Sequence, residues 1–104
     1  MSYEMLVGLN VVDSEVYQQY REAMTPILAS YGGGFGFDGK VSEVLLPLGS
    51  EDINRVFTIF FKDRHAMEQF FAHPEYLKIK EQYFQKSVAS TVIIASYDKK
   101  LDEV

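Results

Sequence analysis

His73 and Tyr76 are the two side chains whose types and spacing best suit acid–base chemistry. They stand three residues apart, on either side of Pro74 and Glu75. A histidine can exchange a proton near neutral pH, and a tyrosine hydroxyl can hold a substrate oxygen. We therefore take His73 and Tyr76 as candidate catalytic residues. The more common situation is structural, with His73 capping a helix and Tyr76 packed in the core.

Four further polar residues are candidate substrate contacts: Asn10, Tyr31, Asp38 and His65. Asn10 interrupts an apolar stretch, and a buried polar group needs a hydrogen-bond partner in the protein or in a ligand. For the other three residues, the alternative to a substrate contact is a structural role. Tyr31 can be a core aromatic, Asp38 can shape a turn or bulge, and His65 can face solvent.

The composition gives no sign of a metal or cofactor. The chain has no cysteine, which excludes thiolate chemistry and cysteine-bound metals. No set of histidine and acidic residues has a recognisable metal-binding spacing. Gly32-Gly33-Gly34 follows a helix and lacks the spacing of a phosphate loop. Seven tyrosines and eight phenylalanines would line any pocket with aromatic rings, which suits a flat apolar ligand.

Length and charge narrow the class of protein. The 104 residues fit one compact domain, which we place at residues 1–97 with a charged tail at 98–104. The net charge is −5 and the basic residues do not cluster, so nucleic acid is not an expected partner. No apolar run approaches the ~18 residues of a membrane span, and no leader sequence is evident. We expect a cytoplasmic protein without a membrane partner.

The stretch Arg55–Lys62 is the predicted strand around which the fold is organised. Its side chains alternate between two faces, with Phe57, Ile59 and Phe61 on one and Val56, Thr58 and Phe60 on the other. Both faces are apolar, whereas a one-sided sheet has a polar face for water. The chain has enough helix to cover only one face. We therefore infer that a second copy of the protein covers the other.

The remaining pattern predicts a ferredoxin-like α+β fold. The expected elements are a strand at 5–12, a helix from Asp13 that Pro26 interrupts, a strand at 35–48 with a bulge or bend at 38–40, a loop at 47–54, a helix from Asp63 broken at Pro74, and a strand at 89–97. The order β-α-β-β-α-β gives a four-stranded antiparallel sheet with both helices on one face. The first and third strands should be central.

Two short motifs resemble a known group of proteins. Tyr31-Gly32-Gly33 closes the first helix, and Pro74-Glu75-Tyr76 lies in the second. The chain thereby resembles an uncharacterised bacterial family of the dimeric α+β barrel superfamily. The resemblance implies a dimer whose two sheets pack into a barrel. Members often have arginines in the strand after Tyr-Gly-Gly, but residues 34–39 contain none, so the resemblance supplies no anion-binding arginine there.

Two functions follow as hypotheses. The superfamily includes cofactor-independent monooxygenases, isomerases, lyases, haem enzymes and ligand-sensing domains, so the resemblance alone does not choose between them. The first hypothesis is a cofactor-independent oxygenase or isomerase that acts on a small apolar or aromatic metabolite. The alternative is a non-catalytic dimer that binds a small molecule or a partner. A cavity with converging polar groups would favour the first hypothesis, and a filled core would favour the second.

Overall fold

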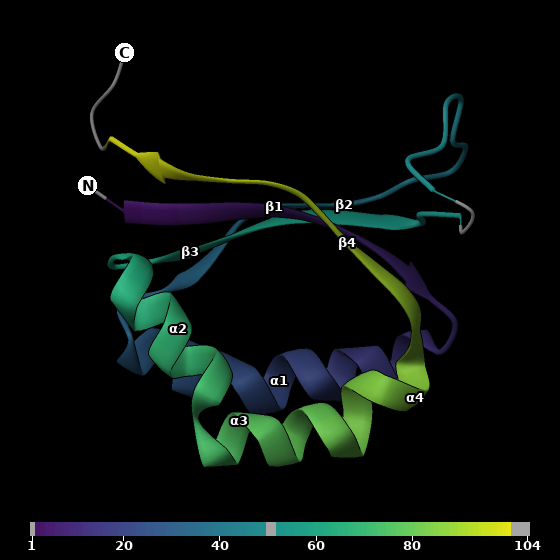
Figure 1. Cartoon of the computed structure of the whole chain (residues 1–104). Helices are drawn as coiled ribbons and strands as arrows, with labels where there is room; N and C mark the ends of the chain where they lie inside the picture. Colours follow the sequence, from purple (N-terminus) through teal and green to yellow (C-terminus); the bar gives the residue numbers. More distant parts are fainter. Residues whose placement is uncertain (1, 50–51, 101–104) are drawn as a thin grey trace.

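The computed structural model of the protein describes residues 2–49 and 52–100. Its elements are β1 (Ser2–Val11), α1 (Ser14–Ser30), β2 (Gly34–Lys40), β3 (Arg55–Phe61), α2 (Arg64–Ala72), α3 (Pro74–Ile79), the π-helix η1 (Lys80–Phe84), α4 (Gln85–Ser87) and β4 (Val88–Lys99). The strands form one antiparallel sheet in the order β2-β3-β1-β4, and the helices lie on one side of it (Figure 1). The predicted ferredoxin-like α+β fold is therefore confirmed, with the first and third strands at the centre.

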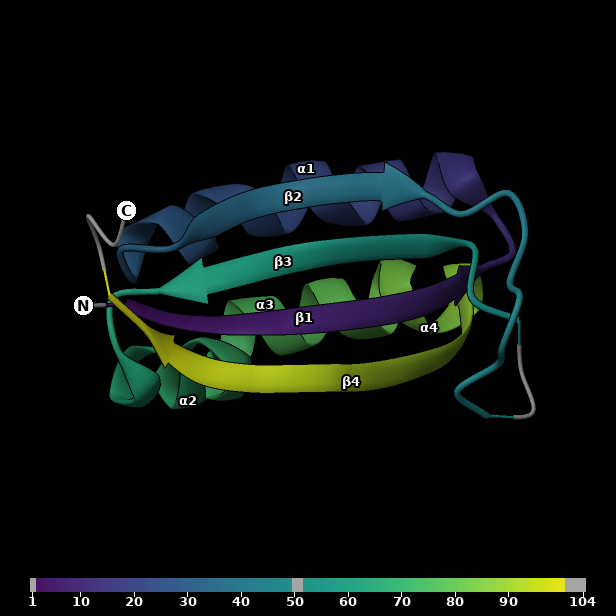
Figure 2. The same cartoon turned by 90° about the horizontal axis from the view of Figure 1, so that it is seen from above.

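The two faces of the sheet follow the alternation of β3. Phe57, Ile59 and Phe61 are buried under the helices. Val56, Thr58 and Phe60 are half-buried and belong to the opposite face, which we call the open face. Figure 2 looks down on the open face, with every helix behind the sheet. The helices cover only one face, as the sequence predicts.

Helix α1 begins and ends where its sequence provides caps. The Asp13 carboxylate accepts a hydrogen bond from the Val16 amide at 3.1 Å, which satisfies a free donor of the first turn. Gly32 follows the helix with a φ of 71°, a conformation that glycine adopts without strain. The helix continues through Pro26 as one element, so the predicted interruption at Pro26 is wrong.

The predicted strand at 35–48 is shorter in the structure. β2 ends at Lys40, which pairs with Arg55, the first residue of β3. Beyond that point β3 offers no partner, and residues 41–49 instead form a loop that rises on the open-face side of the sheet (Figure 1). The predicted loop at 47–54 therefore begins earlier, and its residues 50–51 lie outside the described residues. An irregularity is present in this strand, but the register shifts between Phe35 and Asp38, before the predicted position at 38–40.

The last strand is longer than the prediction of 89–97. β4 runs from Val88 to Lys99, and Lys99 pairs with Ser2 at the start of β1. Because β1 begins at Ser2, the first two residues of the predicted charged tail have a strand to pair with. The end of that tail, residues 101–104, lies outside the described residues.

Candidate functional site

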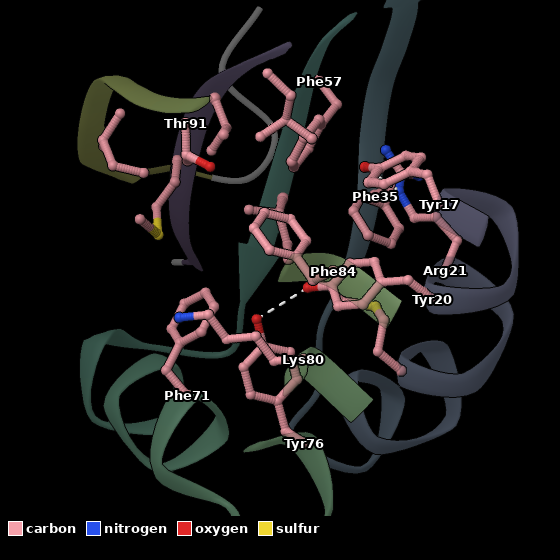
Figure 3. Close-up of a pocket in the computed structure, with 16 residues that line it drawn as sticks. Tyr17, Tyr20, Arg21, Phe35, Phe57, Phe71, Tyr76, Lys80, Phe84 and Thr91 are labelled. Carbon is pink, nitrogen blue, oxygen red and sulfur yellow. Dashed lines mark hydrogen bonds between the residues drawn. The ribbon is translucent and has the colours of Figure 1, made fainter. Parts of the chain in front are cut away.

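A cavity of about 250 Å³ lies between the covered face of the sheet and the helices (Figure 3). The sheet contributes mainly aliphatic and aromatic side chains, namely Met5, Val7, Leu9, Phe35, Phe57, Ile59, Thr91 and Ile93. The helices contribute Tyr17, Tyr20, Arg21, Met24, Phe71, Tyr76, Lys80 and Phe84. Thr91 and Ile93 belong to the edge strand β4 and are exposed, so the cavity is reached from that side.

Tyr20 and Tyr76 form a hydrogen-bonded pair in the cavity wall. Tyr20 comes from α1 and Tyr76 from α3, and their hydroxyl oxygens are 2.9 Å apart. Both side chains are buried, and burial raises the pKa of each hydroxyl above its ordinary value. Two neutral hydroxyls have two hydrogens, and their mutual bond uses one. The tyrosine pair thus retains one O–H that can donate to a ligand oxygen.

Arg21 brings a positive charge to the same wall. Its Nε donates to the Tyr17 hydroxyl at 2.8 Å, and its guanidinium carbon lies 3.8 Å from the centre of the Phe35 ring. A guanidinium over an aromatic face gains a cation–π attraction. Nη2 of Arg21 also lies 3.4 Å from Asp38, a long contact for a hydrogen bond.

Asp38 is held mainly by another arginine. Nε and Nη2 of Arg55 each donate to one oxygen of the Asp38 carboxylate at 2.8 Å. This forked hydrogen bond lowers the pKa of Asp38 and raises the pKa of Arg55, because each charge stabilises the other. Asp38 does not line the cavity, but it contacts Arg21, which does.

The π-helix η1 places two further side chains on the cavity. The amide of Gln85 donates to the carbonyl of Lys80, five residues earlier, which is the spacing of a π-helix. Lys80 and Phe84, one at each end of this wide turn, both line the cavity. The apolar spacing of the sequence is equally consistent with an ordinary α-helix, so no sequence signal distinguishes this turn.

His73 and Tyr31 lie together but outside the lining of the cavity. His73 sits between α2 and α3, where its Nδ1 accepts a hydrogen bond from the Glu75 amide at 3.1 Å. The Tyr31 ring meets the His73 ring edge-on, with centres 6.1 Å apart. Pro74 begins α3, so the predicted helix break is present. The geometry of His73 is that of a helix cap.

The other sequence candidates are dispersed. Asn10 lies near the end of β1, where its side-chain oxygen accepts from the Asn54 amide group at 3.4 Å. His65 is exposed in the first turn of α2. Of the six candidates, only Tyr76 lines the cavity. In the part of the chain that the structure describes, no cluster of three histidine or acidic side chains could hold a metal.

The family described as "Domain of unknown function (DUF1330)" matches residues 3–97. The chain belongs to this family. A search of curated proteins finds no match. Among residues 2–49 and 52–100, no helix is long and apolar enough to cross a membrane.

Solved structures share the fold of this DUF1330 chain at low sequence identity. A protein of unknown function from Rhodopseudomonas palustris is 17% identical, with a TM-score of 0.79 over 95% of this chain and 82% of its own. A dimeric ferredoxin-like protein of unknown function from Thermobifida fusca is 11% identical, with a TM-score of 0.57 over 93% and 90%. A mutant of SnoaB, a cofactor-independent oxygenase from Streptomyces nogalater, is 13% identical, with a TM-score of 0.57 over 98% and 96%.

Most residues that line the DUF1330 cavity were not among the sequence candidates, and three of them bear directly on its chemistry. Tyr20, Arg21 and Lys80 all belong to helices and come together only through the packing of α1 against α3 and η1. One signal was present for Tyr20. The buried face of α1 has tyrosine at two positions, Tyr17 and Tyr20, and a buried tyrosine needs a partner for its hydroxyl. Its partner, Tyr76, lies 56 residues away, beyond any local pattern.

Proposed function

We propose that the chain is a homodimeric, cofactor-independent enzyme that ionises a small apolar or aromatic metabolite in this cavity, as an oxygenase or an isomerase does. The observation behind the proposal is the buried tyrosine pair, which offers a hydroxyl donor inside an otherwise apolar, aromatic-lined space. Pockets of this composition, with few polar groups in fixed positions, are typical ligand sites. Because the cavity is near 250 Å³, the ligand is small.

The chemistry that the tyrosine pair suits is stabilisation of a developing oxyanion. When a ketone becomes an enolate, or a phenol a phenolate, negative charge gathers on one oxygen. A preorganised O–H donor in a dry site stabilises that charge more than water does. The resulting anion can take a proton back at another carbon, which is isomerisation. Alternatively it can pass one electron to dioxygen, and the substrate radical and superoxide so formed then combine through a new C–O bond to a peroxide, which is the first step of oxygenation without a cofactor.

The lining also limits the substrate. Among the described residues that line the cavity there is no histidine, aspartate or glutamate to act as a base. The site therefore suits compounds acidic enough to release a proton to water, such as phenols and readily enolised ketones. The similarity of fold to SnoaB, a cofactor-independent oxygenase, agrees with this class of reaction.

The lack of a histidine or carboxylate base in the described lining also favours the second candidate, a non-catalytic binding protein. In that case the tyrosine pair would only hold a ligand oxygen. The two candidates differ in one measurable respect, because a binding protein would not accelerate the exchange of hydrogen at carbon.

Deuterium exchange separates the two candidates. Flat enolisable ketones, beginning with 2-tetralone, are incubated with the protein in D2O, and loss of the C–H signal beside the carbonyl is followed by proton NMR. Oxygen uptake with 1-naphthol tests the oxygenase branch. We expect exchange or uptake above the uncatalysed rate, and a loss on the order of a hundredfold when Tyr20→Phe and Tyr76→Phe are combined, since the oxyanion donor is then removed. Tyr76→Phe alone leaves the Tyr20 hydroxyl free to donate and should lose less.

Tyr83→Phe is the matched control for this experiment. The Tyr83 hydroxyl accepts a hydrogen bond from Gln82 and does not line the cavity, so its removal should leave the rate unchanged. Binding of the ketone without any acceleration would establish the non-catalytic candidate. Absence of both binding and acceleration across the panel would contradict both.

The homodimer is proposed from the open face. Half-buried apolar side chains, including Val56 and Phe60, lie there, and none of the described helices covers them. The structurally similar Thermobifida fusca protein is dimeric. The open face also has a buried carboxylate, Glu4, which accepts hydrogen bonds from Tyr97 at 2.5 Å and Lys99 at 3.3 Å. Because Glu4 is already paired, a second sheet can cover it without leaving a charge unmatched.

A further inference from the structure

We infer that the ligand of the cavity is an acid, and that its carboxylate binds the guanidinium of Arg21. The inference rests on the proposed function, since it names the substrate class of the same site. Arg21 lies in the wall that separates the cavity from an outer polar hollow. The other residues of this outer hollow are Gln18, Glu22, Thr25, Pro26, Asp38 and Arg55. The inference follows from the hydrogen bonds and the charges around Arg21.

Arg21 has more donors than the protein uses. A guanidinium has five N–H groups. The Nε–H donates to the Tyr17 hydroxyl, and one Nη2–H makes the long contact with Asp38. Among the described residues, Nη1 has no hydrogen-bond partner. The side chain is only 11% exposed, but Ser90 Oγ is the only fully buried side-chain polar atom without a partner among the described residues. The remaining donors of Arg21 therefore meet solvent, which a ligand can replace.

Among residues 2–49 and 52–100, the charges around Arg21 leave an excess of one positive charge. There Arg21 and Arg55 face a single carboxylate, Asp38, and the shorter bonds of Asp38 go to Arg55. Glu22 borders the outer hollow but is exposed to solvent. A second carboxylate at Arg21 would balance the charge, and the planar fork of a guanidinium matches carboxylate geometry.

The surroundings of Arg21 select a flat acid rather than a free inorganic anion. Phe35 and Phe57 lie against the guanidinium, with ring centres 3.8 Å and 4.7 Å from its carbon, and both rings line the cavity. Tyr20, the preceding residue of α1, places the tyrosine pair on the same cavity (Figure 3). An acid with its carboxylate at Arg21 and its ring among these side chains could present a second oxygen to the tyrosine pair.

A matched pair of probes tests the inference. 2-Naphthoate and 2-naphthalenemethanol share one ring system and differ in the carboxylate, and the affinity of each is measured by titration calorimetry. We expect the wild-type protein to prefer naphthoate by about tenfold or more, as a charged hydrogen bond contributes. Arg21→Gln should abolish that preference while retaining binding of the alcohol.

Three further variants support the comparison. Arg64→Gln removes the same charge from an exposed site on α2 and should leave the preference intact. Arg21→Lys keeps the charge without the fork and should show an intermediate preference, which also covers the case in which Arg21→Gln does not fold. Asp38→Asn frees Arg21 of its competing carboxylate and should strengthen naphthoate binding alone.

The failures can be distinguished. If the alcohol binds the wild-type protein but naphthoate has no advantage, or if Arg21→Gln weakens both probes equally, the inference is wrong and the cavity remains a ligand site. If neither probe binds the wild-type protein, the cavity is not a site for flat aromatic ligands, and the proposed function falls together with the inference.

Discussion

The hydroxyl oxygens of Tyr20 and Tyr76 lie 2.9 Å apart in a wall of apolar side chains, so ionising either would place a charge where water cannot solvate it. The pair is therefore a neutral donor, whose role is to hold an oxygen. The sequence led to Tyr76 through its position after the helix break. It did not lead to Tyr20 or Arg21, because their importance depends on long-range packing.

Alkaline titration tests the state of these tyrosines. Burial raises the pKa of Tyr17, Tyr20 and Tyr76, whereas in the unfolded chain each ionises near pH ~10. Above that pH the unfolded state loses protons that the folded state keeps, so the free energy of unfolding should fall as pH rises. Absorbance at 295 nm should show these tyrosines ionising only on unfolding.

Ionisation of the buried tyrosines in the folded protein would contradict this prediction. If all seven tyrosines ionised near pH ~10 while circular dichroism still showed the folded protein, the tyrosine pair would be accessible to water. The variant with Tyr20→Phe and Tyr76→Phe is the control, and its stability should fall less steeply above that pH.

At the scale of elements, periodicity predicted most of the fold. The alternation of β3 and the helical spacing of α1 are local properties of the chain, and both elements are present. The prediction of a strand at 35–48 is wrong after Lys40. A strand needs a partner, and β3 begins at Arg55, which pairs with Lys40. The π-helix η1 was missed because its extra residue per turn is set by packing rather than by residue type.

The helix break at His73 gives a prediction at this scale. His73→Ala should lower the free energy of unfolding by about 1 kcal/mol, the usual contribution of a cap, because the Glu75 amide loses its acceptor. His73→Asn keeps an acceptor and should restore most of the loss. His65→Ala, at an exposed site, should change stability by less than about 0.5 kcal/mol.

Chemical denaturation of these variants decides the role of His73. Unchanged stability in His73→Ala, combined with loss of the deuterium exchange proposed above, would instead support the candidate catalytic role of His73.

At the scale of the whole molecule, the helices cover one face of the sheet, and we propose that a second copy covers the other (Figure 1). The apolar residues on both faces of β3 led to this expectation. The structure decides which face is open, since Ile59 is buried under the helices and Phe60 is on the other side.

Phe60→Asp should convert the dimer to a monomer, because two copies of the buried charge would meet without partners. Light scattering after size-exclusion chromatography measures the mass, and circular dichroism checks folding. Leu77→Asp places the same charge on α3, away from the open face, and should leave the dimer intact. A folded Phe60→Asp dimer would show that another surface joins the subunits.

The most direct test of the central claim locates a ligand by methyl NMR. Protein labelled at methionine and isoleucine methyls is titrated with 2-naphthalenemethanol. If the cavity is the ligand site, Met5, Met24, Ile59 and Ile93 should shift, because they line it. Shifts confined to methyls outside the lining, such as Met67 and Ile53, would contradict the assignment of the cavity as the functional site.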